Sequence, residues 1–137
     1  MILPREQRSV TAPNGAMHFG VIPDHVAAHL GVSAGEIRLL NGFDHGGKGF
    51  GLAHLASKPQ RILQMNGLGF RSIEQFVWHV CQNYTRISNG GERLGLCAEY
   101  NHHTLVAYID WREDRTIWSV VTALPMRTCR EPILWRA

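Results

Sequence analysis

Cysteine is scarce in this sequence, and the few cysteines lie far apart. Cys81, Cys97 and Cys129 are the three present, and no Cys-x-x-Cys pair occurs. A disulfide framework or a structural zinc site therefore has no support, because both need paired or clustered thiols. We expect reduced thiols, most of them buried.

Long hydrophobic runs are absent as well. No apolar run approaches the about 20 residues that span a membrane, and the first residues, MILPREQR, lack the apolar segment of a signal peptide. These absences favour a protein of the cytoplasm, or one delivered into a target cell's cytoplasm as part of a larger system.

Several motifs of metal and hydrolase chemistry are missing. The chain has no His-Glu-x-x-His and no Asp-x-Asp sequence. The glycine-rich stretch 46–51 reads GGKGFG and is not followed by the Gly-Lys-Ser/Thr of a phosphate-binding loop. The sequence therefore predicts neither a metal site nor a cofactor.

Lysine is the rarest cation. Only Lys48 and Lys58 are lysines among 14 cationic residues, so the other 12 are arginines, and the formal net charge is +3. A guanidinium binds phosphate through two parallel hydrogen bonds, whereas an ammonium acts as a point charge. The bias indicates either a phosphate-bearing partner or an arginine-rich source genome.

The 137 residues fit a single domain, 1–137, in which 1–16 form a loose arm or an edge strand. Helices are expected in the first two thirds of the chain, at 24–31, 50–56, 60–65 and 72–84, with Pro59 separating the second from the third. Short strands are expected at 17–22 and 36–40. Residues 43–49, with three glycines, are expected to form a mobile loop, and 88–91 a turn.

From residue 93 the hydrophobic period changes from helical to alternating. Strands are expected at 94–100, 105–111 and 117–124, joined by short turns, and the apolar tail 133–135 should dock on them. With a loop at 112–115, Trp111 would face Thr116 and Ile109 would face Trp118. The order predicts an α+β fold, with N-terminal helices packed on a C-terminal antiparallel β-meander.

One helical imidazole, His54, remains as a candidate for acid/base chemistry near neutral pH. Together with the arginines and the strand exit at 121–127, it would suit cleavage of RNA without a metal. A base takes the proton of the ribose 2′-OH, and cations stabilise the charge that develops on phosphorus. Alone, a histidine on a helix is more often a packed or capped residue.

The order and spacing of several segments resemble one nuclease group. The segments are GFGLAHL at 49–55, LGFRSIEQFV at 68–77, NYTRI at 83–87, VTALPMR at 121–127 and the closing Leu134-Trp135, preceded by GEIRL at 35–39. They look like the phage and mobile-element branch of the barnase, EndoU, colicin and RelE-like nuclease superfamily. The resemblance covers about Phe19 to Trp135.

This resemblance implies a toxin-like endoribonuclease that cuts RNA, tRNA included, to a 2′,3′-cyclic phosphate and a 5′-OH. It places the catalytic imidazole at His54, the alcohol at Thr122 and the phosphate-binding cation at Arg127. An immunity or inhibitor protein would be its partner, since free ribonuclease harms its host.

Further cations are available to bind the substrate: Lys48, Lys58, Arg61 and Arg93. Tyr84 is a further candidate, although it also continues the apolar stripe of its helix and so fits the core. Thr122 can equally be a β-branched strand residue. A module on the same fold that binds RNA or protein without cutting it is the alternative function.

Overall fold

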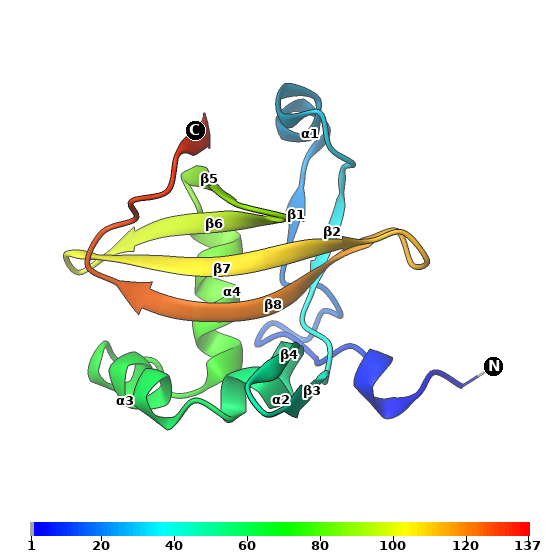
Figure 1. The fold of residues 1–137 in the computed structure, drawn as a ribbon, viewed down its shortest axis with the longest axis vertical. Coiled ribbons are helices and arrows are strands. Elements are labelled where there is room, and N and C mark those ends of the chain that lie inside the picture. The colour runs from blue at the N-terminus through cyan, green and yellow to red at the C-terminus, as the bar shows by residue number, and fades with distance from the viewer. Residues whose placement is uncertain (1) are drawn as a thin grey trace.

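The computed structural model describes residues 2–137, which form four α-helices, a short 3-10 helix and nine strands (Figure 1). The helices are α1 (Asp24–Leu30), α2 (Gly51–Ala56), α3 (Pro59–Gly67) and α4 (Ile73–Asn83), with the 3-10 helix at Arg5–Gln7. The strands are β1 (Gly20–Ile22), β2 (Gly35–Arg38), β3 (Phe43–His45), β4 (Lys48–Phe50), β5 (Arg86–Gly90), β6 (Arg93–Tyr100), β7 (His103–Arg112), β8 (Ile117–Met126) and β9 (Ile133–Arg136).

Seven of the strands make one curled sheet in the order β1-β2-β8-β7-β6-β5-β9. The predicted α+β class and the β6-β7-β8 meander are confirmed. The sheet is nevertheless mixed, because β2 runs parallel to β8 while the other neighbours are antiparallel. The helices also do not form an N-terminal block, since β1 to β4 alternate with them along the chain.

Helix α4 covers one face of the sheet, behind β6, β7 and β8 in Figure 1. Its start has the predicted cap: the backbone N–H of Gln75 donates to Ser72 Oγ at 3.1 Å. The rings of Phe70 and Phe76 lie 5.2 Å apart, as a hydrophobic staple places them. The helix buries its apolar stripe against the sheet: Phe76, Val77, Val80 and Cys81. We call the opposite face of the sheet the front face.

The β7–β8 register differs from the prediction. Trp111 pairs with Trp118, their rings 5.4 Å apart, and Ile109 pairs with Val120. The connecting loop comprises 113–116 rather than 112–115, because Thr116 adopts a φ of 52° and leaves the strand. The two tryptophans still share the aliphatic face of the sheet, as predicted.

Residues expected to form a turn at 88–91 belong largely to β5. This strand pairs with β6 on one side and with the C-terminal strand β9 on the other, so the predicted docking of the tail is confirmed. Hydrogen bonding on both sides overrides the turn preference of its serine, asparagine and glycine residues. The turn itself lies at Gly91, whose N–H donates to Asn89 Oδ1.

The N-terminal arm contacts the body of the fold. Ser9 forms a bridge with Leu40, and Ala12 is buried in the core. The β7–β8 end of the sheet also holds the arm, because Arg115 donates to the carbonyl of Gln7 and Arg112 donates to its side chain at 2.8 Å. Among residues 2–137, no helix is long and apolar enough to cross a membrane.

The segment expected to be a mobile loop is instead the β3–β4 hairpin. Phe43 pairs with Phe50, and Gly46 and Gly47 make the two-residue turn with positive φ angles of 61° and 86°. Gly51, which follows the hairpin, approaches another backbone: a Cβ there would lie 2.4 Å from the carbonyl oxygen of Leu40. The glycine at position 51 therefore allows the two backbones to pack closely and does not indicate mobility.

This distinction predicts unequal effects of alanine. Gly51→Ala should lower the free energy of unfolding by more than about 2 kcal/mol, because strain at its φ of 76° adds to the clash with Leu40. Gly46→Ala is the matched control, since its φ of 61° is similar but its Cβ would meet nothing within 4 Å. It should cost about 1–2 kcal/mol in urea unfolding. Equal losses would contradict the packing role of Gly51.

Candidate active site

An aspartate–histidine pair lies where the hairpin meets α2. His54 Nδ1 is 2.8 Å from Asp44 Oδ1, and the histidine is only 7% exposed. The pairing follows from the chain path: β4 runs directly into α2, and the hairpin turn returns Asp44 toward the first helical turn. The contact therefore joins two residues that lie ten positions apart in the sequence.

This contact sets the chemistry of the imidazole. A carboxylate accepts a hydrogen bond, so Nδ1 carries the proton and Nε2 keeps its lone pair in the neutral ring. Nε2 has no hydrogen-bond partner among the described residues. It is also not fully enclosed, because the fully enclosed side-chain nitrogen and oxygen atoms that lack a partner are those of His18, Trp78 and Ser119. One ring nitrogen of His54 is thus paired with Asp44, and the other has no protein partner within residues 2–137.

The environment keeps Asp44 ionised. The hydrogen bond from His54 lowers the pKa of its carboxyl group, and Ser57 and the charge of Lys58 act in the same direction, against the partial burial that raises it. Lys58, a predicted binding cation, therefore lies beside the Asp44–His54 pair. An ionised Asp44 holds the imidazole in one orientation.

A second polar pair joins α3 to β8. Arg61, in the first turn of α3, donates from Nη1 to Thr122 Oγ1 at 2.8 Å. Thr122 belongs to the part of β8 that β2 leaves uncovered, because β2 pairs only with Trp118 and Ser119. Helices α2 and α3 both contact β8, and Figure 1 shows the two helices next to that strand, below it in the view.

A β-bulge orients Thr122. The β7–β8 register shifts between Tyr108 and Ile109, so Val121 has no partner and Thr122 pairs with Tyr108. Without the extra residue, strict alternation after the buried Val120 would turn Thr122 toward the core. With it, Ala123 returns to the core and Thr122 reaches Arg61.

Arg127 lies elsewhere. It is exposed beyond the end of β8, in a hollow of about 380 Å³ shared with His103 and the C-terminal part of α3. Gly67 lines this hollow, and it lies about 9 Å along the helix axis from Arg61. The structure therefore brings Arg61, and not Arg127, to Thr122.

The other predicted binding residues occupy two further places. Lys48 and Arg93 line a hollow on the front face of the sheet. Tyr84 lies apart from both, near β1 and β9: its hydroxyl donates to the carbonyl of Val21 at 2.8 Å, and its ring is 5.9 Å from that of Trp135. Burial raises the pKa of Tyr84 to about 12. The packing interpretation of Tyr84 fits these contacts.

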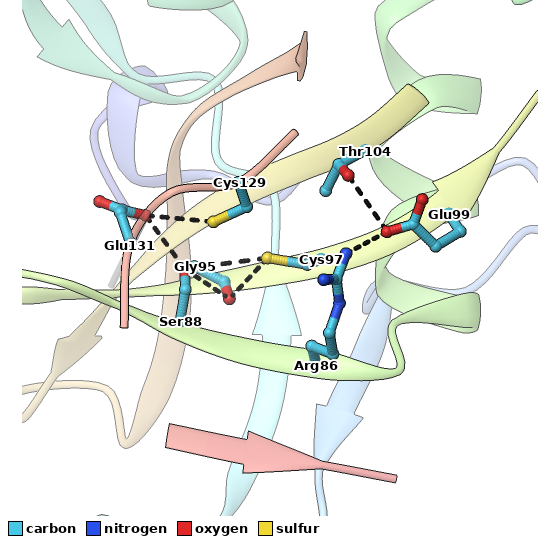
Figure 2. Close-up of polar contacts among 8 residues, drawn as sticks. All are labelled: Arg86, Ser88, Gly95, Cys97, Glu99, Thr104, Cys129 and Glu131. Carbon is cyan, nitrogen blue, oxygen red and sulfur yellow. Dashed lines mark hydrogen bonds and ion pairs between the residues drawn. The ribbon is translucent and has the colours of Figure 1, made fainter. Parts of the chain in front are cut away.

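A cluster on the front face fastens the C-terminal segment (Figure 2). Glu131 Oε1 accepts hydrogen bonds from Ser88 at 3.0 Å and from Tyr108 at 2.8 Å. Nearby, burial raises the pKa of the Cys97 thiol to about 11. This thiol therefore stays protonated at neutral pH and is unsuited to nucleophilic chemistry. The predicted burial is confirmed for Cys81 and Cys97, while Cys129 is half-buried.

Sequence reasoning missed Asp44, because it lies in the segment that was expected to be mobile. A local signal exists: a Gly-Gly pair between Phe43-Asp44 and Phe50 is typical of a tight hairpin, which would return the aspartate toward the next helix. Within 2–137, no group of three or more histidine, cysteine, aspartate or glutamate side chains is arranged to hold a metal ion.

Comparisons with protein-family models, with curated proteins and with solved structures found no match to this chain. The resemblance to the nuclease superfamily therefore stays a prediction from the sequence.

The depressed pKa of Asp44 predicts a pH-dependent stability. The pKa of Asp44 is lower in the folded protein than in the unfolded chain. The ionised carboxylate therefore stabilises the fold at pH values above its unfolded pKa, and this stabilisation is lost as the pH falls through its folded pKa. Between about pH 5 and pH 3, the free energy of unfolding should fall less steeply for Asp44→Asn than for the wild type. Glu92→Gln, an exposed carboxylate in the β5–β6 turn, is the control and should retain the wild-type slope. An unchanged slope in Asp44→Asn would contradict the pairing.

Proposed function

We propose that the protein is a metal-independent endoribonuclease in which His54 is the proton-transferring residue. The observation that supports this most directly is the 2.8 Å contact between His54 Nδ1 and Asp44 Oδ1, which leaves Nε2 without a protein partner in the described part of the chain. A histidine that merely fills space in a core does not need an ionised partner on one nitrogen. This arrangement is the one general-base chemistry requires.

In the proposed reaction, Nε2 of His54 removes the proton of a ribose 2′-OH. The 2′-oxygen attacks the adjacent phosphorus, and the bond from phosphorus to the 5′-oxygen breaks. The imidazolium returns its proton to that leaving oxygen, which gives a 2′,3′-cyclic phosphate and a 5′-OH. Asp44 stabilises the imidazolium between the two proton transfers, because its carboxylate carries the opposite charge.

Arg61 is proposed to stabilise the negative charge on the phosphorane. One of its N–H groups is held by Thr122 Oγ1, which restrains the guanidinium while its other N–H groups remain for phosphate oxygens. This assignment revises the role expected for Arg127. In the proposal, Arg127 binds a more distant part of the RNA, together with the other exposed cations.

The proposal includes a protein partner and a cytoplasmic site of action. A ribonuclease of this kind would damage the RNA of any cell that makes it, so an immunity or inhibitor protein would have to cover the His54 region. The substrate class is RNA, tRNA included. The toxin-like and mobile-element character of the protein remains an expectation from the sequence resemblance.

Replacing His54 tests the central role. His54→Asn keeps a donor toward Asp44 but has no nitrogen that titrates near neutral pH, so cleavage of tRNA or total RNA should fall by about 10²–10⁴-fold. The assay uses labelled RNA in buffer with excess EDTA, and it identifies the new ends as cyclic phosphate and 5′-OH. His29→Ala, on α1, is the matched histidine control and should cleave normally.

Two outcomes would contradict the ribonuclease proposal. Undiminished cleavage by His54→Asn would remove His54 from the mechanism. Retardation of RNA by the wild type without any new ends would favour the binding module instead, a function that the low exposure of His54 would suit.

The two arginines can be compared directly. Arg61→Met should lower kcat by about 10²-fold, because the charge that it stabilises develops only in the transition state. Arg127→Met should lower kcat by less than about tenfold and act mainly on KM, if Arg127 contacts distant phosphates. A larger loss of kcat in Arg127→Met would restore the assignment expected from the sequence.

A further inference from the structure

A hollow of about 320 Å³ opens between the β3–β4 hairpin and the front face of β7 and β8. The hairpin contributes two phenylalanines, Phe43 and Phe50, and the exposed Lys48. The volume of the hollow is at the lower end of the range of about 300–1,000 Å³ for small-molecule sites. One nucleotide is an occupant of suitable size.

The charge in this hollow is mostly positive. Lys48, Arg93 and Arg112 line it, against a single carboxylate, Asp110. Arg93 Nε is 3.4 Å from Asp110 Oδ2, so that contact is loose, and both side chains are partly exposed. The hollow therefore has cationic groups left over for an anion.

Ser119 is the buried polar residue of the hollow. It is 2% exposed, and its Oγ has no hydrogen-bond partner. A buried hydroxyl without a partner costs free energy, which a well-packed chain normally avoids. The unpaired Oγ among cations indicates that an oxygen of a ligand supplies the missing bond.

Aromatic rings form the other wall. The rings of Phe43 and Phe50 meet edge to face with centroids 5.2 Å apart, and the guanidinium of Arg112 lies 5.8 Å from the centroid of Phe50. Aromatic rings and guanidinium planes are the surfaces on which single-stranded bases stack. The hollow thus combines groups for a phosphate with groups for a base.

We propose that this hollow binds one nucleotide of single-stranded RNA next to the one that is cut, an inference that rests on the proposed ribonuclease function. The phosphate contacts Arg93 and Lys48, and one of its oxygens accepts a hydrogen bond from Ser119 Oγ once the side chains around that hydroxyl move aside. The base lies against the phenylalanines. Phe43 precedes Asp44 in β3, so one strand contributes both to the hollow and to the Asp44–His54 pair.

Binding can be measured without cleavage. Adenosine 3′-monophosphate, adenosine and inorganic phosphate are titrated separately into the wild-type protein by calorimetry. The nucleotide should bind more tightly than either part. Ser119→Ala should weaken nucleotide binding by about tenfold, the loss expected for a hydrogen bond to a charged group. It should leave the Tm unchanged or raised, because it removes an unpaired hydroxyl.

Ser88→Ala is the matched control, since Ser88 is also buried but its hydroxyl is paired with Glu131. It should lower the Tm and bind the nucleotide as the wild type does. Equal nucleotide affinity in the wild type, Ser119→Ala and Arg93→Ala would overturn the proposal, as would an absence of binding.

The His54→Asn variant separates this inference from the proposed function. If it and the wild type bind the nucleotide equally but the wild type cuts no RNA, the ribonuclease proposal fails and the nucleotide site stands. If the wild type cuts RNA and Ser119→Ala leaves KM unchanged, the ribonuclease stands and the nucleotide site is overturned.

Discussion

The candidate site depends on close contact between backbones. The segments that meet are the β3–β4 hairpin, the start of α2 and the segment before β3. A Cβ at Gly42 would lie 1.8 Å from the carbonyl oxygen of Phe50, and one at Gly49 would lie 1.9 Å from that of Phe43. Such spacing admits only glycine. It brings Asp44 onto the imidazole of His54, so the geometry of the pair follows from main-chain packing.

The second half of the site depends on an irregularity in the sheet. The bulge at Val121 turns Thr122 toward Arg61 while Val120 and Ala123 stay in the core. This strand, β8, is paired with β7 along one edge. On its other edge β2 pairs only near its start, and α2 and α3 contact the strand. One strand thus serves as both a core element and a support for polar side chains.

Much of the fold was predictable because it follows from local periodicity. Helix α4 has a capping serine and one apolar stripe, and β6 to β8 alternate in the way that half-buried strands do. The break at Pro59 likewise separates α2 from α3, as predicted. The hairpin was not predictable in this way, because its strands are three residues long and its glycines have the composition of a loop.

The candidate site was only partly predictable for a related reason. His54 could be selected as a helical imidazole, and Thr122 through a resemblance, but their partners are set by tertiary structure. Asp44 depends on a hairpin turn, and the choice of Arg61 over Arg127 depends on where α3 lies along β8. A bulge has no clear local signature, so the orientation of Thr122 could not be inferred from strand alternation.

The parallel pairing of β2 with β8 has a consequence for how the chain folds. Ile37 and Arg38 pair with Trp118 and Ser119, which lie about 80 residues further along the chain. Contacts between segments so distant in sequence carry a large loop-closure entropy and slow the folding rate. The segments before β8 have no completed sheet to dock on, so the assembly of the His54 region must wait until β8 has left the ribosome.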